Sequence, residues 1–75
     1  MTLSKQVLTI EALERLRSSR LGNPRYLVRF TNGVTARTGV NSMAAIGLEN
    51  SEYRQGPVIV TFDGSGFIVG VKPAP

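Results

Sequence analysis

Apolar and polar residues alternate along residues 25–37, as they do in two antiparallel strands that share one buried face. A three-residue loop over residues 31–33 places Phe30 opposite Val34 and keeps one face apolar, whereas a two-residue loop mixes the two faces. We therefore predict the three-residue loop, with Gly33 in the left-handed conformation. The outer face of this hairpin then carries Arg25, Leu27, Arg29, Thr35 and Arg37.

A second hairpin is predicted near the C-terminus, where residues 57–62 and 67–71 alternate on either side of a glycine-rich turn. Its predicted buried face holds Phe62 opposite Phe67. The other face carries Ile59 and Ile68, which is unusually apolar for a surface in contact with water. We therefore predict that these two isoleucines contact a second copy of the chain, most simply in a two-fold dimer.

The segment before the first hairpin carries Ile10, Leu13 and Leu16 at the spacing of one helix face. Thr9 is a residue type that caps helix N-termini, and Gly22 followed by a proline is typical of a helix end. We therefore predict an N-terminal helix that packs on the hairpins.

A helix of about two turns is also predicted over residues 41–47, and a polar loop with a single helical turn over residues 49–56. These elements predict an α+β fold: an N-terminal helix packed on two antiparallel β-hairpins, which form a single curled sheet or small barrel, with a short connecting helix. One domain covers residues 1–75, with residues 1–8 as an N-terminal arm or edge strand and residues 73–75 as a flexible tail.

The chain has 75 residues and contains neither cysteine nor histidine. Disulfides, zinc sites of Cys and His, and Ser-His-Asp or Cys-His catalysis are therefore excluded within one chain. We predict no enzymatic activity, no cofactor and no metal. Small chains without cross-links often oligomerise, which also favours a homo-oligomer. No apolar run is long enough to cross a membrane and the N-terminus does not look like a signal peptide, so we expect an intracellular protein without a membrane partner.

The formal net charge of +4 favours an anionic partner. Arg25, Arg29 and Arg37 are the leading binding candidates, because guanidinium groups hold phosphates and carboxylates through paired hydrogen bonds. Tyr53 and Arg54 are the next candidates, since a tyrosine beside an arginine can stack on a base. The alternative is that these charges only keep an exposed sheet soluble and protect its edge.

Short segments distributed over nearly the whole chain carry a family resemblance. They are Leu8-Thr9-Ile10, Gly22-Asn23-Pro24-Arg25-Tyr26, Thr35-Ala36-Arg37-Thr38, Gly47, Glu52-Tyr53-Arg54 and Pro57-Val58-Ile59-Val60-Thr61. With these segments the chain resembles a family of small proteins from phages that infect actinobacteria, including mycobacteriophages. The resemblance implies a phage gene product that acts in the cytoplasm of the infected bacterial host. It implies no activity and no functional residue.

Charge and resemblance together predict a non-enzymatic phage accessory protein that acts in host takeover or counter-defence. It would bind an anionic ligand, such as a nucleotide-like signal, or a host target. Two alternatives stay open. The first is a nucleic-acid-binding protein that uses the basic sheet face, and the second is a protein-binding or structural phage component that uses the surface around Ile59 and Ile68.

Overall fold

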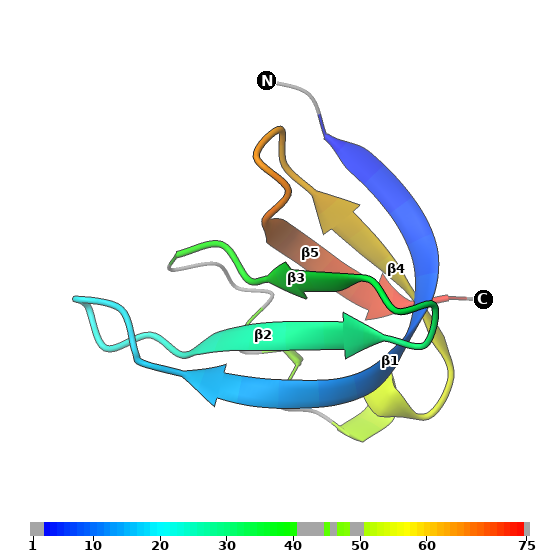
Figure 1. Ribbon diagram of the computed structural model, residues 1–75, viewed down its shortest axis with the longest axis horizontal. Helices are drawn as coiled ribbons and strands as arrows, with labels where there is room; N and C mark the ends of the chain where they lie inside the picture. Colours follow the sequence, from blue (N-terminus) through cyan, green and yellow to red (C-terminus); the bar gives the residue numbers. More distant parts are fainter. Residues whose placement is uncertain (1–2, 41–44, 46, 49–50, 75) are drawn as a thin grey trace.

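The computed structural model describes residues 3–40, 45, 47–48 and 51–74. The elements, in chain order, are β1 (Ser4–Leu16), β2 (Arg25–Phe30), β3 (Thr35–Arg37), the 3-10 turn η1 (Ser51–Arg54), β4 (Pro57–Phe62) and β5 (Ile68–Pro73). The strands form one antiparallel sheet in the order β3-β2-β1-β4-β5 (Figure 1). The described residues therefore form a nearly all-β domain, and the predicted α+β class is wrong.

β1 connects the two sides of the sheet, because each half of this strand pairs with a different neighbour. Residues 4–9 pair with β4, and residues 10–16 pair with β2. Figure 1 shows β1 bending strongly along its length, so that the β2-β3 side of the sheet curls over toward the β4-β5 side. The curl gives the sheet a concave side, which is where the core lies.

The predicted N-terminal helix is absent, because residues 10–16 belong to β1. The register between β1 and β2 shifts by one residue at Glu11, which forms a β-bulge. The extra residue changes the spacing of core-facing side chains from two to three, so that Ile10 and Leu13 both face the core. A spacing of three is also a helical spacing, and this coincidence is why the pattern predicted a helix.

The two edges of the sheet meet where the chain leaves β3. Thr38 forms a parallel bridge with Ile68, and the Gly39 N–H donates to the Ile68 carbonyl at 2.8 Å. Thr38 is fully buried, and its hydroxyl oxygen accepts a hydrogen bond from the Tyr26 N–H at 3.0 Å. These bonds hold the curled sheet nearly closed.

The core fills the concave side of the sheet and joins its two halves. Phe30 from β2 and Phe62 from β4 meet edge to face, with ring centroids 6.5 Å apart. The buried apolar residues are Ile10, Tyr26, Val28, Phe30, Ala45, Leu48, Val58, Val60, Phe62 and Ile68. Because they come from both halves, neither half buries its apolar face without the other.

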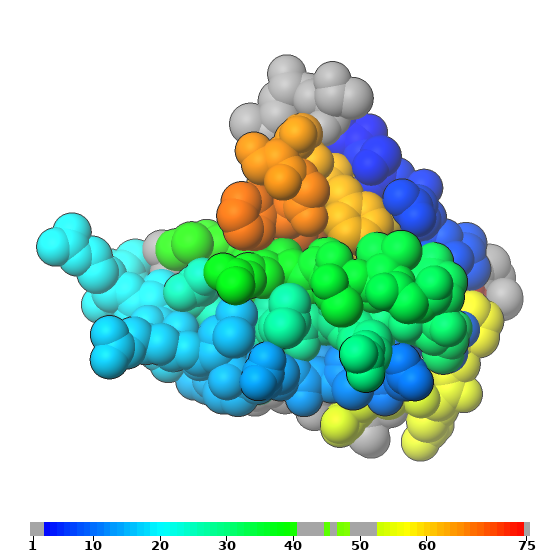
Figure 2. Space-filling view, viewed as in Figure 1, coloured from blue at the N-terminus to red at the C-terminus, as the bar shows by residue number. Residues whose placement is uncertain are grey.

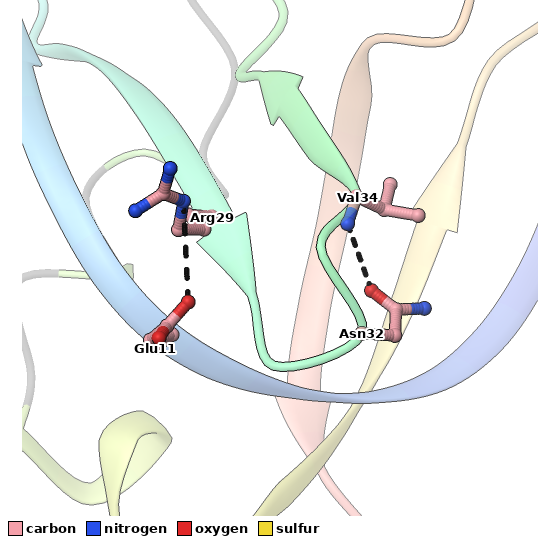
Figure 3. Close-up of polar contacts among 4 residues, drawn as sticks. All are labelled: Glu11, Arg29, Asn32 and Val34. Carbon is pink, nitrogen blue, oxygen red and sulfur yellow. Dashed lines mark hydrogen bonds and ion pairs between the residues drawn. The ribbon is translucent and has the colours of Figure 1, made fainter.

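The first hairpin has the predicted register. The Phe30 N–H donates to the Val34 carbonyl, and Gly33 closes the three-residue loop with φ +89°. The side-chain oxygen of Asn32 accepts a hydrogen bond from the Val34 N–H at 3.0 Å (Figure 3). The prediction of the loop length and of the glycine conformation is therefore confirmed.

The second hairpin uses the same three-residue turn, but its return strand differs from the prediction. The Asp63 N–H donates to the Phe67 carbonyl, which places Phe62 opposite Ile68. A bulge at Val69 then shifts the register. Ile68 is therefore fully buried, whereas Phe67 and Val69 are each 37% exposed, so the predicted pairing of Phe62 with Phe67 is wrong.

The remaining predicted segments are described only in part. Most of the short helix expected over residues 41–47 lies outside the described residues. The single turn expected within residues 49–56 is the 3-10 turn η1. At the C-terminus, Pro73 ends β5 and the Ala74 N–H donates to the Pro57 carbonyl at 3.1 Å, while Pro75 lies outside the described residues.

The Gly33→Ala variant is expected to lower the free energy of unfolding by about 1 kcal/mol, because an alanine is strained at positive φ. No heavy atom lies within 4 Å of a Cβ built at Gly33, so the cost comes from the backbone alone. Urea denaturation measures the change. Gly56→Ala is the matched control, since Gly56 is equally open and has no positive φ. Equal stability of the two variants would contradict the assigned turn.

The Phe62→Ala variant is expected to cost roughly 3–5 kcal/mol, because it opens a cavity beside Phe30 where the two halves meet. In so small a domain this cost can equal the whole free energy of unfolding. Circular dichroism would then show no cooperative unfolding transition. Phe67→Ala removes the same side chain from a half-exposed site and should cost far less. A larger loss for Phe67→Ala than for Phe62→Ala would show that the faces are assigned incorrectly.

Candidate anion-binding surface

The strand register places the three predicted arginines on the convex side of the sheet. We term this surface the arginine face; it consists of Ala12, Glu14 and Leu16 on β1, Arg25, Leu27 and Arg29 on β2, and Thr35 and Arg37 on β3. Leu27 lies opposite Arg37 on one side and opposite Glu14 on the other. Arg29 and Arg37 are exposed and Arg25 is half-buried. The register therefore brings the three arginines to one face, and their role in binding stays a prediction.

Two carboxylates share this side of the sheet with the arginines. A Glu11 carboxylate oxygen lies 3.9 Å from the Arg29 Nε (Figure 3). Both side chains are more than half exposed, so the pair adds little to stability. Glu14 lies on the arginine face itself, beside Leu27. The sequence pattern did not show these carboxylates here, because the predicted helix placed them on another element.

A depression of about 250 Å³ lies on the arginine face. It is lined by Ala12, Leu13, Glu14, Leu27, Arg29 and Thr35. Its apolar residues come from β1 and β2, while Arg29, Thr35 and Glu14 supply a cation, a hydroxyl and a carboxylate. The depression therefore offers both hydrogen-bond donors and acceptors around an apolar centre.

Arg25 stands at the end of the arginine face where β2 begins. Its Nε is buried and is the one buried side-chain nitrogen or oxygen of the described residues without a hydrogen-bond partner. A buried donor without a partner is unfavourable. The other nitrogens of the Arg25 guanidinium can still donate to an anion at the surface.

Tyr53 and Arg54 do not join the arginine face. Both belong to η1, which contacts β1, β4 and β5. Tyr53 is half-buried and packs against the core, and its ring would lie 3.2 Å from a Cβ built at Gly47. A ring held in this way supports the core, so it is not positioned to stack on a ligand bound at the arginine face.

The excess positive charge lies next to the arginine face, in a segment that we term the finger (residues 15–25). Four arginines and no acidic residue fall within it, at positions 15, 17, 20 and 25. The rest of the chain holds five cationic and five acidic residues, which cancel. The entire net charge of +4 therefore equals that of the finger. A count of charge along the sequence would have found this, but the predicted helix assigned two of these arginines to a helix end.

The finger comprises the end of β1, the loop and the start of β2, and its loop projects from the body of the protein (Figure 2). Ser19 organises this loop: its N–H donates to the Asn23 carbonyl, and its own carbonyl accepts from the Gly22 N–H, both at 2.9 Å. At the base, the Arg15 guanidinium donates to the Ser18 hydroxyl and lies 5.6 Å from the Tyr26 ring centre. The loop of the finger is therefore held together by hydrogen bonds among its own residues.

The tip of the finger combines charge with an apolar side chain. Leu21 is 76% exposed, more than any other large hydrophobic residue of the described part of the chain. Arg17 and Arg20 are exposed on the same loop. Basic loops with an apolar tip are used by proteins that press a side chain against nucleic-acid bases.

The predicted contact between copies retains only one of its two isoleucines. Ile68 is fully buried within the chain because the three-residue turn places it opposite Phe62, so its side chain does not reach a partner. Ile59 is half-buried and lies opposite Val7, which is 64% exposed. A homo-oligomer stays a prediction, with Val7 and Ile59 as the remaining apolar pair.

None of the described residues belongs to a helix long and apolar enough to span a membrane, and within the same residues no group of metal-ligating side chains comes together. Comparison with known protein families, curated proteins and solved structures finds no match to this chain. The resemblance to actinobacterial phage proteins stays a prediction, and the surface itself supplies the grounds for a function.

Proposed function

We propose that this protein is a non-enzymatic nucleic-acid-binding module whose contact surface is the finger together with the arginine face. The observation that carries this proposal is the concentration of the whole net charge in the finger, whose loop projects from the body of the protein. Such a loop attracts a polyanion and releases its counterions, which is the main source of affinity in nucleic-acid binding. In an infected bacterium, a protein of this kind would act in host takeover or counter-defence by occupying a nucleic acid.

The distribution of arginines favours a polymeric ligand over a single small anion. Arg17 and Arg20 lie on the loop, Arg25 at its base, and Arg29 and Arg37 farther along the arginine face. Arg25 and Arg29 are four residues apart on one strand, which is ~13 Å at the usual rise. Phosphates repeated along a chain can meet such a row of arginines one after another, whereas a single phosphate cannot.

A mononucleotide is the second candidate ligand, because the depression on the arginine face is small. Its volume of about 250 Å³ lies below the roughly 300–1,000 Å³ of typical ligand pockets. A nucleotide bound there would use Arg29 and its neighbours and would leave the finger without a role. The two candidates therefore differ in whether the finger matters.

The Arg17→Gln/Arg20→Gln double variant tests the proposal. Fluorescence anisotropy with a labelled single-stranded oligonucleotide, repeated over a range of salt concentrations, gives affinity and salt dependence together. The logarithm of the binding constant falls with the logarithm of the salt concentration. Each lost phosphate contact is expected to make this negative slope shallower by about 0.7, so the double variant should have a slope shallower by about 1.4. The fold is expected to persist, because both side chains are exposed.

Lys5→Gln/Lys72→Gln is the matched control. It removes the same charge from exposed positions on β1 and β5, away from the finger. Its salt slope should stay close to that of the unchanged protein. Equal losses in the two double variants would mean that binding reflects net charge alone. If a free mononucleotide binds as tightly as the oligonucleotide, the proposal of a polymeric ligand is wrong and the mononucleotide is the ligand.

A further inference from the structure

We propose that the depression on the arginine face binds one unpaired nucleobase, with a preference for guanine, and that the nucleic acid is therefore single-stranded. This inference rests on the proposed function and specifies its ligand. It follows from the chemistry of the depression lining, which differs from that of the finger. The finger carries only positive charge, whereas the depression contains a carboxylate.

The floor of the depression suits the flat face of a base. Ala12 lies opposite Arg29, and Leu27 lies opposite Glu14, so Ala12 and Leu27 are diagonal neighbours on adjacent strands. Diagonal neighbours on one sheet face are close enough to form a continuous apolar patch. A base can lie on this patch by apolar contact, which does not require an aromatic side chain. A depression of about 250 Å³ is too small for a larger ligand of drug size.

Arg29 borders this floor with an exposed guanidinium group. Its Nε lies 3.9 Å from a Glu11 carboxylate oxygen, and Figure 3 shows one terminal nitrogen of the guanidinium directed away from Glu11 and the other to the side. Thr35 lies opposite Arg29 and adds a hydroxyl to the same border. These groups donate hydrogen bonds to the acceptor atoms of a base or to the adjacent phosphate.

Glu14 determines which chemical groups of a ligand can bind at the border of the depression opposite Arg29. An ionised carboxylate accepts hydrogen bonds and cannot donate them, and it repels a phosphate. Its natural partner in a nucleic acid is a base edge that presents N–H groups. Guanine presents two of them side by side on its Watson–Crick edge, so that both carboxylate oxygens are engaged. Glu14 therefore excludes the backbone from the depression and selects the base.

Arg37 completes the arrangement for the backbone. It lies on the other side of Leu27 from Glu14, two strand spacings or ~10 Å away. A nucleotide whose base reaches Glu14 thus has an exposed guanidinium on the opposite side for its phosphate. In a duplex the same base edge is paired and the base is stacked, so binding it here would first require unpairing and unstacking. The site is therefore suited to single strands.

Four nine-nucleotide oligomers test the inference: oligothymidylate, and the same oligomer with guanine, adenine or cytosine at its centre. Anisotropy at fixed low salt is expected to show about tenfold tighter binding of the guanine oligomer than of oligothymidylate, the gain of one good bidentate contact. A duplex of the same length should bind more weakly than the guanine oligomer. In Glu14→Gln the guanine preference should fall below about threefold, because the paired acceptors are lost.

Glu52→Gln is the matched control, since it removes the same charge from η1, an element that supplies no residue to the depression. Both variants should bind oligothymidylate slightly more tightly, and only Glu14→Gln should lose the preference for guanine. Oligomers that bind equally whatever their central base, or a preference that persists in Glu14→Gln, would overturn the base site and leave the proposed function intact. No binding of any oligomer at low salt would overturn the proposed function itself.

Discussion

The structure depends on the shared strand β1, which has to complete two half-sheets at once. Its first half pairs with β4 and its second half with β2, and the bulge at Glu11 lies where the pairing changes. A bulge adds local twist and bend, which allows one strand to follow both halves as they curl toward each other. The apolar faces of the halves then meet across the core, through Phe30 and Phe62. A straight β1 would leave each half with its apolar face exposed.

The same curl separates the core from the candidate site. Side chains on the concave side of β2 are buried, and those on the convex side form the arginine face. Because successive side chains of a strand point to opposite faces, Val28 in the core fixes the direction of Leu27 and Arg29 outside. The finger is the far end of the pair formed by β1 and β2, and Figure 1 shows its loop projecting beyond the ends of these two strands. The core and the candidate site therefore lie on opposite sides of one sheet.

The surface chemistry is divided between two neighbouring regions. The finger holds charge of one sign, which suits long-range attraction of a polyanion. The arginine face mixes three arginines with Glu14 and an apolar floor, which suits short-range selection of a hydrogen-bonding partner. Sequence reasoning identified the arginines on the hairpin. It missed Glu11 and Glu14 beside them and the finger next to them, because all of these depend on β1 being a strand.

The sequence by itself determined the turn of the first hairpin and much of the core face of the sheet. In the first hairpin, Gly33 and the alternation around it permit only one register that keeps an apolar face, and burial enforces that register. Tertiary structure alone decided the two bulges, at Glu11 and Val69. Each bulge changes the inward spacing from two residues to three, and the one at Glu11 made β1 resemble a helix. Ile68 was predicted on the wrong face because the turn of the second hairpin pairs it with Phe62. A bulge occurs where strands must bend to close a shared core, and that requirement comes from pairing partners far away in the chain.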